Sequence, residues 1–175
     1  SGLLHAIGRQ GGPPVPPLNL VADYGGGAMM LIAGVLAALF QRSRSGKGQV
    51  IDAAMVEGAA MLATPVHAFM AAGLWSDARG ENLLDSGAPF YDTYETADAR
   101  YVAVGCLEPR FFAEFARLLP LDQRFVPGQY DRTTWAAMRA EIAERIKQRT
   151  RDDWEALFAA SDACVAPALS LLEAR

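Results

Sequence analysis

The sequence has few of the residues that most often carry covalent or metal chemistry. Among 175 residues there are two cysteines, Cys106 and Cys164, and two histidines, His5 and His67. Two cysteines are too few for a disulfide framework or a zinc site, so we expect neither a bound metal nor a disulfide, and a reducing, cytoplasmic setting fits. The residue order also shows no Ser-His-Asp or Cys-His arrangement.

Charge and long apolar runs are also scarce. Charged residues make up 21% of the chain, the formal net charge is −4, and 51% of the residues are hydrophobic. We find no basic stripe with interleaved aromatic residues, which excludes a typical nucleic-acid-binding surface. The most apolar run, residues 28–40, is shorter than the roughly 20 residues needed to cross a bilayer. It therefore predicts a buried core helix and no membrane span.

The residues that are present divide the chain into two regions. In residues 1–75 the pattern predicts a Gly/Pro-rich linker (residues 9–17), a helix (24–43) and a turn (45–48). A short β-like stretch (49–52) and a second helix (53–72), broken before Pro65, follow. In residues 76–175 it predicts a β-hairpin followed by helices and an extended segment. The hairpin strands are expected over residues 90–96 and 100–106, the helices from Pro109 and over 133–149 and 151–160, and the extended segment over 164–169.

One carboxylate, Asp23, is the clearest candidate for chemistry. It lies in the run LNLVADYGGG, where an apolar approach meets three glycines and a helix pattern begins. A ligand could come close to so bare a backbone, and the N-terminus of a helix favours an anion. In the alternative interpretation Asp23 only caps the helix and the glycines only make a turn.

A second carboxylate, Glu108, stands between the predicted strand 100–106 and the helix that begins at Pro109. The strand alternates poorly, so we expect both of its faces to be buried. A carboxylate at this junction either points into a cleft or caps the helix. The neighbouring Cys106 is interpreted as a packed residue, because nothing nearby would lower the pKa of its thiol.

Four long motifs carry a resemblance to a known family. LNLVADYGGG, RSGKGQVIDAAMVEG, LLDSGAPFYDTYETADARYVAVGCLEPRFF and DACVAPALS resemble the α-methylacyl-CoA racemases of the family III CoA-transferase (CaiB/BaiF) superfamily. The resemblance implies an α/β fold in which residues 1–75 form part of a Rossmann-like large domain. Residues 76–175 would form a small α+β domain and the start of the return to the large domain. It also implies an interlocked homodimer.

The resemblance further implies racemisation at the α-carbon of 2-methylacyl-CoA thioesters, through an enolate-like intermediate. This reaction needs an acid/base group on each face of the carbon. Asp23 falls on the family's catalytic aspartate, and Glu108 falls on the glutamate that pairs with a catalytic histidine. That histidine belongs to a motif that lies upstream of Ser1 in relatives, so His5 is not it. The chain alone is therefore expected to be an inactive fragment.

The remaining implied site residues surround the substrate. Coenzyme A is part of that acyl-CoA substrate, so no separate cofactor is expected. Asn19 and Tyr91 would hold the aspartate, and Leu107 would form a wall of the pocket. Met55 would either face the acyl chain or belong to the core. Gly25 and Gly26 would let the thioester approach the backbone.

Two other functions stay open. In a family III CoA-transferase the same aspartate is a nucleophile that forms an acyl anhydride and then an aspartyl-CoA thioester. The glycine-rich loop of that branch is not seen here, and Glu108 favours the racemase. In the third interpretation the segment has no activity.

Overall fold

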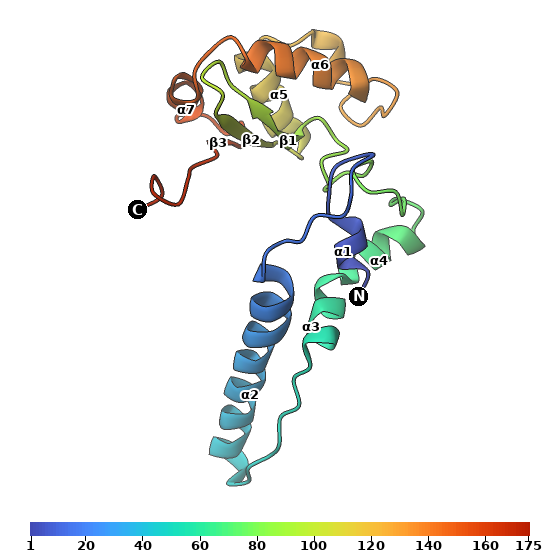
Figure 1. Cartoon of the computed structure of the whole chain (residues 1–175), viewed down its shortest axis with the longest axis vertical. Helices are drawn as coiled ribbons and strands as arrows, with labels where there is room; N and C mark the ends of the chain where they lie inside the picture. Colours follow the sequence, from blue (N-terminus) through green and yellow to red (C-terminus); the bar gives the residue numbers. More distant parts are fainter. The chain divides into compact units, whose positions relative to one another are not determined.

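The computed structural model describes residues 1–175. The chain folds as two compact units, Ser1–Gly80 and Glu81–Arg175, and each is described by itself. Figure 1 shows the first unit from blue to green and the second from light green to red. The first unit is entirely helical outside its loops, whereas all three strands belong to the second.

Unit 1 is built on one long helix. After the short α1 (Leu3–Ala6), the π-helix η1 (Leu20–Met29) continues without interruption into α2 (Met30–Ser45). The linker at residues 9–17 is non-helical, as predicted. Gly46 ends α2 in the left-handed conformation, at φ 72°, where its N–H donates to the carbonyl oxygen of Arg42 at 2.8 Å. Glycine is favoured at this position because it has no Cβ to clash.

The long helix differs from the prediction in both length and burial. The prediction of a helix at this place is confirmed, but the helix begins at Leu20 and includes the glycine run. The combined helix Leu20–Ser45 has 26 residues, and only 6% of its most apolar 18-residue stretch is buried within the chain. The prediction of a buried core helix is therefore wrong for this chain. By length and composition alone the helix could cross a membrane, and a core helix of a soluble protein shares both properties.

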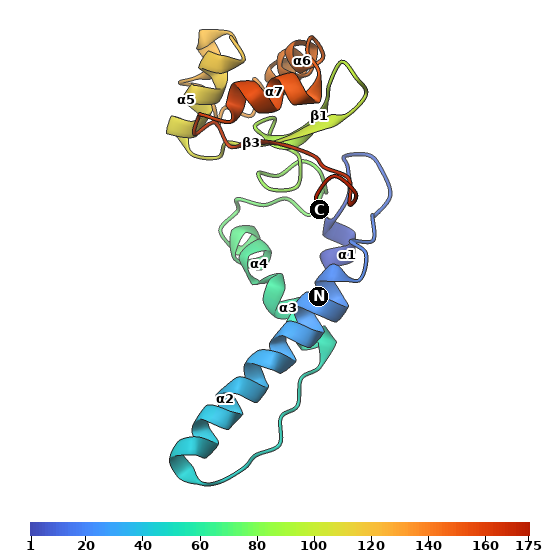
Figure 2. The same cartoon turned by 90° about the vertical axis from the view of Figure 1, so that its left-hand side faces the viewer.

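Two helices and one irregular segment complete unit 1. Helices α3 (Met55–Leu62) and α4 (Thr64–Ala71) meet at Ala63, so the break expected before Pro65 is confirmed. The predicted β-like stretch at residues 49–52 forms no strand. A strand needs a hydrogen-bonding neighbour, and unit 1 contains no other strand. Figure 2 shows this segment as the irregular connection between α2 and α3.

Glycine packing joins η1 to α3. A Cβ on Gly58 would lie 1.8 Å from the carbonyl oxygen of Gly26, and a Cβ on Gly26 would lie 2.7 Å from the backbone nitrogen of Ala59. Both distances are shorter than any normal van der Waals contact. The two backbones can approach this closely only because both helices have glycine at the crossing.

Unit 2 is a three-stranded antiparallel sheet with helices. The strands β1 (Tyr91–Glu95), β2 (Tyr101–Gly105) and β3 (Val165–Pro167) lie in the order β1-β2-β3. Helices α5 (Pro109–Leu118), α6 (Trp135–Ile146) and α7 (Arg151–Phe158) and the short 3₁₀ helix η2 (Gln123–Phe125) follow β2. The predicted hairpin and the helix start at Pro109 are confirmed. The helix predicted over residues 151–160 is confirmed as well, and Thr150 and Asp153 form a capping box at its start.

The helices cover one face of the sheet and form an aromatic core with it. Phe90, Phe112 and Phe115 are completely buried, and their rings contact one another or Phe158 at centroid distances of 5.6 to 6.3 Å. In β2, Val102 and Val104 are buried whereas Tyr101 is exposed and the remaining residues are partly exposed. The expectation that both faces of this strand are buried is therefore wrong within this chain, because helices cover only one face.

A buried ion pair attaches α6 to the sheet. Asp92 of β1 is 8% exposed and accepts a hydrogen bond from the guanidinium of Arg139. The same guanidinium donates to the carbonyl oxygens of Ser86 and Gly87, at 2.6 and 2.9 Å. One side chain therefore joins the helix, the first strand and the loop that precedes it.

A second ion pair holds the C-terminal segment against α7. Arg151 is buried and donates to Glu173 at 2.8 and 3.1 Å. The N–H of Ser170 donates to the same carboxylate at 2.8 Å. The hydrogen bond from Arg151 is the main reason that the pKa of Glu173 falls to about 2.

Candidate functional site

Asp23 lies in the first turn of η1 and does not cap it. The N-cap residue is Asn19, whose side chain makes no capping hydrogen bond, while its carbonyl oxygen accepts from the N–H of Tyr24 at 3.1 Å. Asp23 is exposed, and its carboxylate makes no hydrogen bond or ion pair within the chain. The interpretation of Asp23 as a helix cap is thus wrong, and its carboxylate is free to meet a ligand.

The π-helical backbone around Asp23 is unusual. Its N–H groups bond to carbonyls five residues earlier, and π-helical segments are rare and occur often at functional sites. The N-terminal end of the long helix Leu20–Ser45 also carries a partial positive charge, which stabilises an anion near its first turn. Sequence patterns gave no sign of the π-helix, because the apolar spacing alone predicts an α-helix.

The glycines after Asp23 pack closely against α3, and Gly26 is the one that its backbone requires. Cβ atoms built on Gly25 and Gly27 would lie 3.0 Å from side-chain atoms of Leu62 and Met55, and Gly26 faces α3 as described above. The expectation that Gly26 leaves room for a thioester is corrected, because the backbone of α3 fills the space that its missing side chain leaves. For Gly25, which is partly exposed, the expectation stays a prediction. Met55 is half exposed at the start of that helix, so it is not a core residue of this chain.

Glu108 lies at the N-cap position of α5 without capping it. Its backbone is extended, at φ −72° and ψ 140°, as the following Pro109 requires. Its carbonyl oxygen accepts from the N–H groups of Phe111 and Phe112, both at 3.0 Å, while its exposed carboxylate makes no hydrogen bond within the chain. The cap interpretation is therefore wrong for this residue also. Asp23 and Glu108 belong to different units.

Two other predicted site residues lie at the same end of the hairpin as Glu108. Tyr91 opens β1 and pairs with Gly105, the last residue of β2, and Leu107 follows two residues later. Tyr91 also lines a pocket of about 390 Å³ on the open face of the sheet, together with Val104, Cys164 and other residues. The three residues Tyr91, Leu107 and Glu108 therefore lie near one end of the hairpin, and of the three only Tyr91 lines this pocket.

The negative charge of Glu108 contributes to the pKa values of two neighbouring side chains. Burial, and then the negative charge of Glu108, raises the pKa of the Tyr130 hydroxyl and of the Cys164 thiol. Burial also raises the pKa of Cys106, which is completely buried, so the prediction that Cys106 is a packed and unreactive residue is confirmed.

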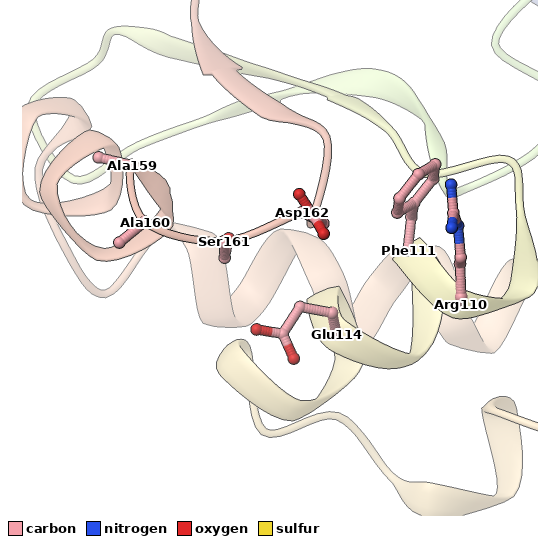
Figure 3. A pocket seen from close by; sticks show the side chains of 7 residues that line it. All are labelled: Arg110, Phe111, Glu114, Ala159, Ala160, Ser161 and Asp162. Carbon is pink, nitrogen blue, oxygen red and sulfur yellow. The ribbon is translucent and has the colours of Figure 1, made fainter.

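A separate polar pocket of about 460 Å³ lies between α5 and the segment after α7 (Figure 3). The guanidinium of Arg110 stacks on the ring of Phe111 at 4.3 Å, and Glu114 pairs with Arg117 at 2.8 Å. Figure 3 shows Glu114 and Asp162 facing this space. None of the predicted site residues lines it.

Comparison with known proteins identifies the family. The sequence pattern of CoA-transferase family III matches residues 1–175. The chain belongs to CoA-transferase family III. It is 47% identical over 174 residues to the alpha-methylacyl-CoA racemase of Mus musculus and 44% identical over 173 residues to that of Homo sapiens. Each match covers 99% of this chain but only 46% or 45% of the relative.

The fold agrees with that assignment. A crystal structure of a CAIB/BAIF family protein from Brucella suis superimposes with a TM-score of 0.70 at 27% identity, over 98% of this chain and 46% of the other. The predicted resemblance to α-methylacyl-CoA racemases and the predicted fold class are thus confirmed. The family III chain described here spans fewer than half of the residues of the racemases that it matches.

Proposed function

We propose that this chain forms part of an enzyme that racemises 2-methylacyl-CoA thioesters. The observation that carries the proposal is the likeness, over 99% of the chain, to two proteins named as alpha-methylacyl-CoA racemases. The free, exposed carboxylates of Asp23 and Glu108 support it, because both are available for proton chemistry.

In the proposed reaction Asp23 removes or returns the α-proton on one face of the α-carbon. A histidine from the rest of the complete protein, paired with Glu108, does the same on the other face. The pair of bases is needed because a single base returns the proton to the face from which it came. Each group in such a pair typically contributes a factor of about 10² to 10⁴ in rate.

Negative charge develops on the thioester oxygen as the proton leaves. The N-terminal turn of the long helix that contains Asp23 would stabilise this charge through its dipole. We place no thioester contact on Gly26, because α3 covers it.

We further propose that the complete protein is a homodimer. Exposed leucine, isoleucine, valine and phenylalanine residues run along α2, at positions 31, 32, 35, 36, 39 and 40. Contiguous apolar surface of this kind on a protein marks a contact site. Size-exclusion chromatography with light scattering on the complete protein tests the assembly, and a monomeric mass contradicts it.

The function is tested by proton exchange in deuterated water with the two enantiomers of a 2-methylacyl-CoA, using the complete protein. Substituting Asp23→Asn keeps the shape of the side chain and removes the base. We expect exchange from one enantiomer to fall by at least about 10². Asp77→Asn is the matched control, since Asp77 is an exposed carboxylate of the same unit.

Two outcomes contradict the proposal. Unchanged exchange from both enantiomers in the Asp23→Asn variant removes Asp23 from the reaction. Modification of Asp23 by hydroxylamine during turnover, detected by mass spectrometry, indicates the covalent intermediate of a CoA-transferase instead.

A further inference from the structure

The backbone that leads into Glu108 is held by two residues of a distant loop. The side-chain amide of Gln129 donates to the carbonyl oxygens of Cys106 and Leu107, at 3.0 and 2.8 Å. The hydroxyl of Tyr130 donates to the same carbonyl oxygen of Leu107. Both acceptor sites of the carbonyl group that immediately precedes Glu108 are therefore occupied.

The loop that carries Gln129 and Tyr130 is itself held by a hydrogen bond and by ring contacts. The indole N–H of Trp135 donates to the carbonyl oxygen of Gln129 at 2.9 Å. The ring of Phe90 lies edge-on to Tyr130 and to Trp135, at centroid distances of 5.6 and 5.8 Å. Gln129 and Tyr130 are therefore both tied to the aromatic core, Gln129 through the indole of Trp135 and Tyr130 through the ring of Phe90.

The side-chain amide of Gln129 is only partly satisfied by hydrogen bonds, which is unusual for a buried residue. It is 2% exposed, and its side-chain oxygen is buried without a hydrogen-bond partner, although its nitrogen makes two bonds. An unpaired buried oxygen destabilises the fold and calls for an explanation. The amide must turn its nitrogen toward the two carbonyl groups, and the geometry of the turn before Glu108 supplies the reason.

Glu108 needs such support because its own side chain receives none. Its carboxylate has no hydrogen-bond partner within the chain, so the position of the carboxylate follows from the position of the backbone. Pro109 restricts that backbone on one side, and the carbonyl of Leu107 fixes it on the other.

We propose that Gln129 and Tyr130 are positioning residues for Glu108. The inference rests on the proposed racemase function, in which Glu108 orients the histidine on one face of the substrate. Loss of either donor lets the turn move, and misplacement of a supporting group by about 1 Å lowers the rate by up to 10²-fold. The loss falls on the proton transfer that uses the histidine and spares the one that uses Asp23.

The experiment measures α-proton exchange from each enantiomer, and its pH profile, in the complete protein with Tyr130→Phe or Gln129→Met. Tyr130→Phe keeps the ring packing and removes only the hydroxyl, so we expect a loss of roughly tenfold for one enantiomer. Gln129→Met removes two hydrogen bonds, and we expect a larger loss for the same enantiomer, with a shifted pH profile. Tyr101→Phe, at an equally exposed tyrosine of β2, is the control and should change neither.

The possible results separate the explanations. Equal losses for both enantiomers, or no loss, overturn the positioning role while the racemase function stands. Absence of exchange in the unsubstituted protein overturns the proposed function itself. If Gln129→Met does not fold, the result for Tyr130→Phe decides, because that variant leaves the core packing intact.

Discussion

Replacing Arg139 with methionine should destabilise unit 2 strongly. The substitution keeps much of the aliphatic side chain but leaves the buried carboxylate of Asp92 without its cation, and the carbonyl groups of Ser86 and Gly87 without their donor. Removing one partner of a buried ion pair costs about 3–5 kcal/mol. Asp92 keeps a hydrogen bond from the N–H of Thr93 at 2.8 Å, and the side chain of Arg139 is 34% exposed, so solvent replaces part of its contacts. The loss should therefore lie near the lower limit, at about 3 kcal/mol.

Urea denaturation followed by tryptophan fluorescence measures this change, since Trp135 and Trp154 both lie in unit 2. Thermal unfolding should show a midpoint lowered by roughly 12–24 °C for a unit of this size. The double variant Asp92→Asn/Arg139→Met removes both charges and should recover about half of the lost stability, because no charge remains buried alone. A loss below about 1 kcal/mol for Arg139→Met, or an equal loss in the single and double variants, refutes the reasoning.

Three further predictions concern packing, pH and reactivity. Gly58→Ala places a Cβ 1.8 Å from the carbonyl oxygen of Gly26, so we expect η1 to separate from α3 and hydrogen exchange in η1 to accelerate. The depressed pKa of Glu173, about 2 against a usual value near 4.5, stabilises the fold above pH 4.5, and this contribution is lost as the pH falls toward 2. Arg151→Met should flatten the pH dependence of stability in that window, measured by denaturation at several pH values. Iodoacetamide should leave Cys106 unlabelled in the native protein and label it in urea, as mass spectrometry will show.

Each of these predictions has a contrary result. Unchanged hydrogen exchange in η1 of the Gly58→Ala variant contradicts the first prediction, because it shows that η1 and α3 stay packed despite the added Cβ. If the stability of the Arg151→Met variant falls between pH 4.5 and pH 2 as steeply as that of the unsubstituted protein, other carboxylates control stability at low pH. Rapid labelling of Cys106 in the folded protein indicates that the core opens frequently.

Local signals in the sequence predicted most of unit 2. Thr150 and Asp153 stand three residues apart before a helix pattern and form the capping box, and Pro109 begins α5. The hairpin turn was expected between the two β-rich runs and lies there. These features depend on residues that are close in sequence, so their spacing was sufficient.

Features that depend on distant partners were not predicted. Gly26 was expected to leave a ligand space, whereas it packs against Gly58, on another helix. The hydrogen bonds of Gln129 join residues 22 and 23 positions apart, and no periodic pattern marks such a pair. Asp23 and Glu108 were singled out as candidates, but whether their carboxylates were free of capping bonds depended on the backbone conformation.

The scarcity of buried side chains in unit 1 has a consequence during protein synthesis. Residues 1–80 leave the ribosome before residues 81–175, and the aromatic core that stabilises the later segment does nothing for the earlier one. The apolar surface of α2 therefore stays open to chaperones and proteases until another surface covers it. Any surface that binds α2 in its folded form also stabilises unit 1, because binding to the folded state shifts the unfolding equilibrium toward it.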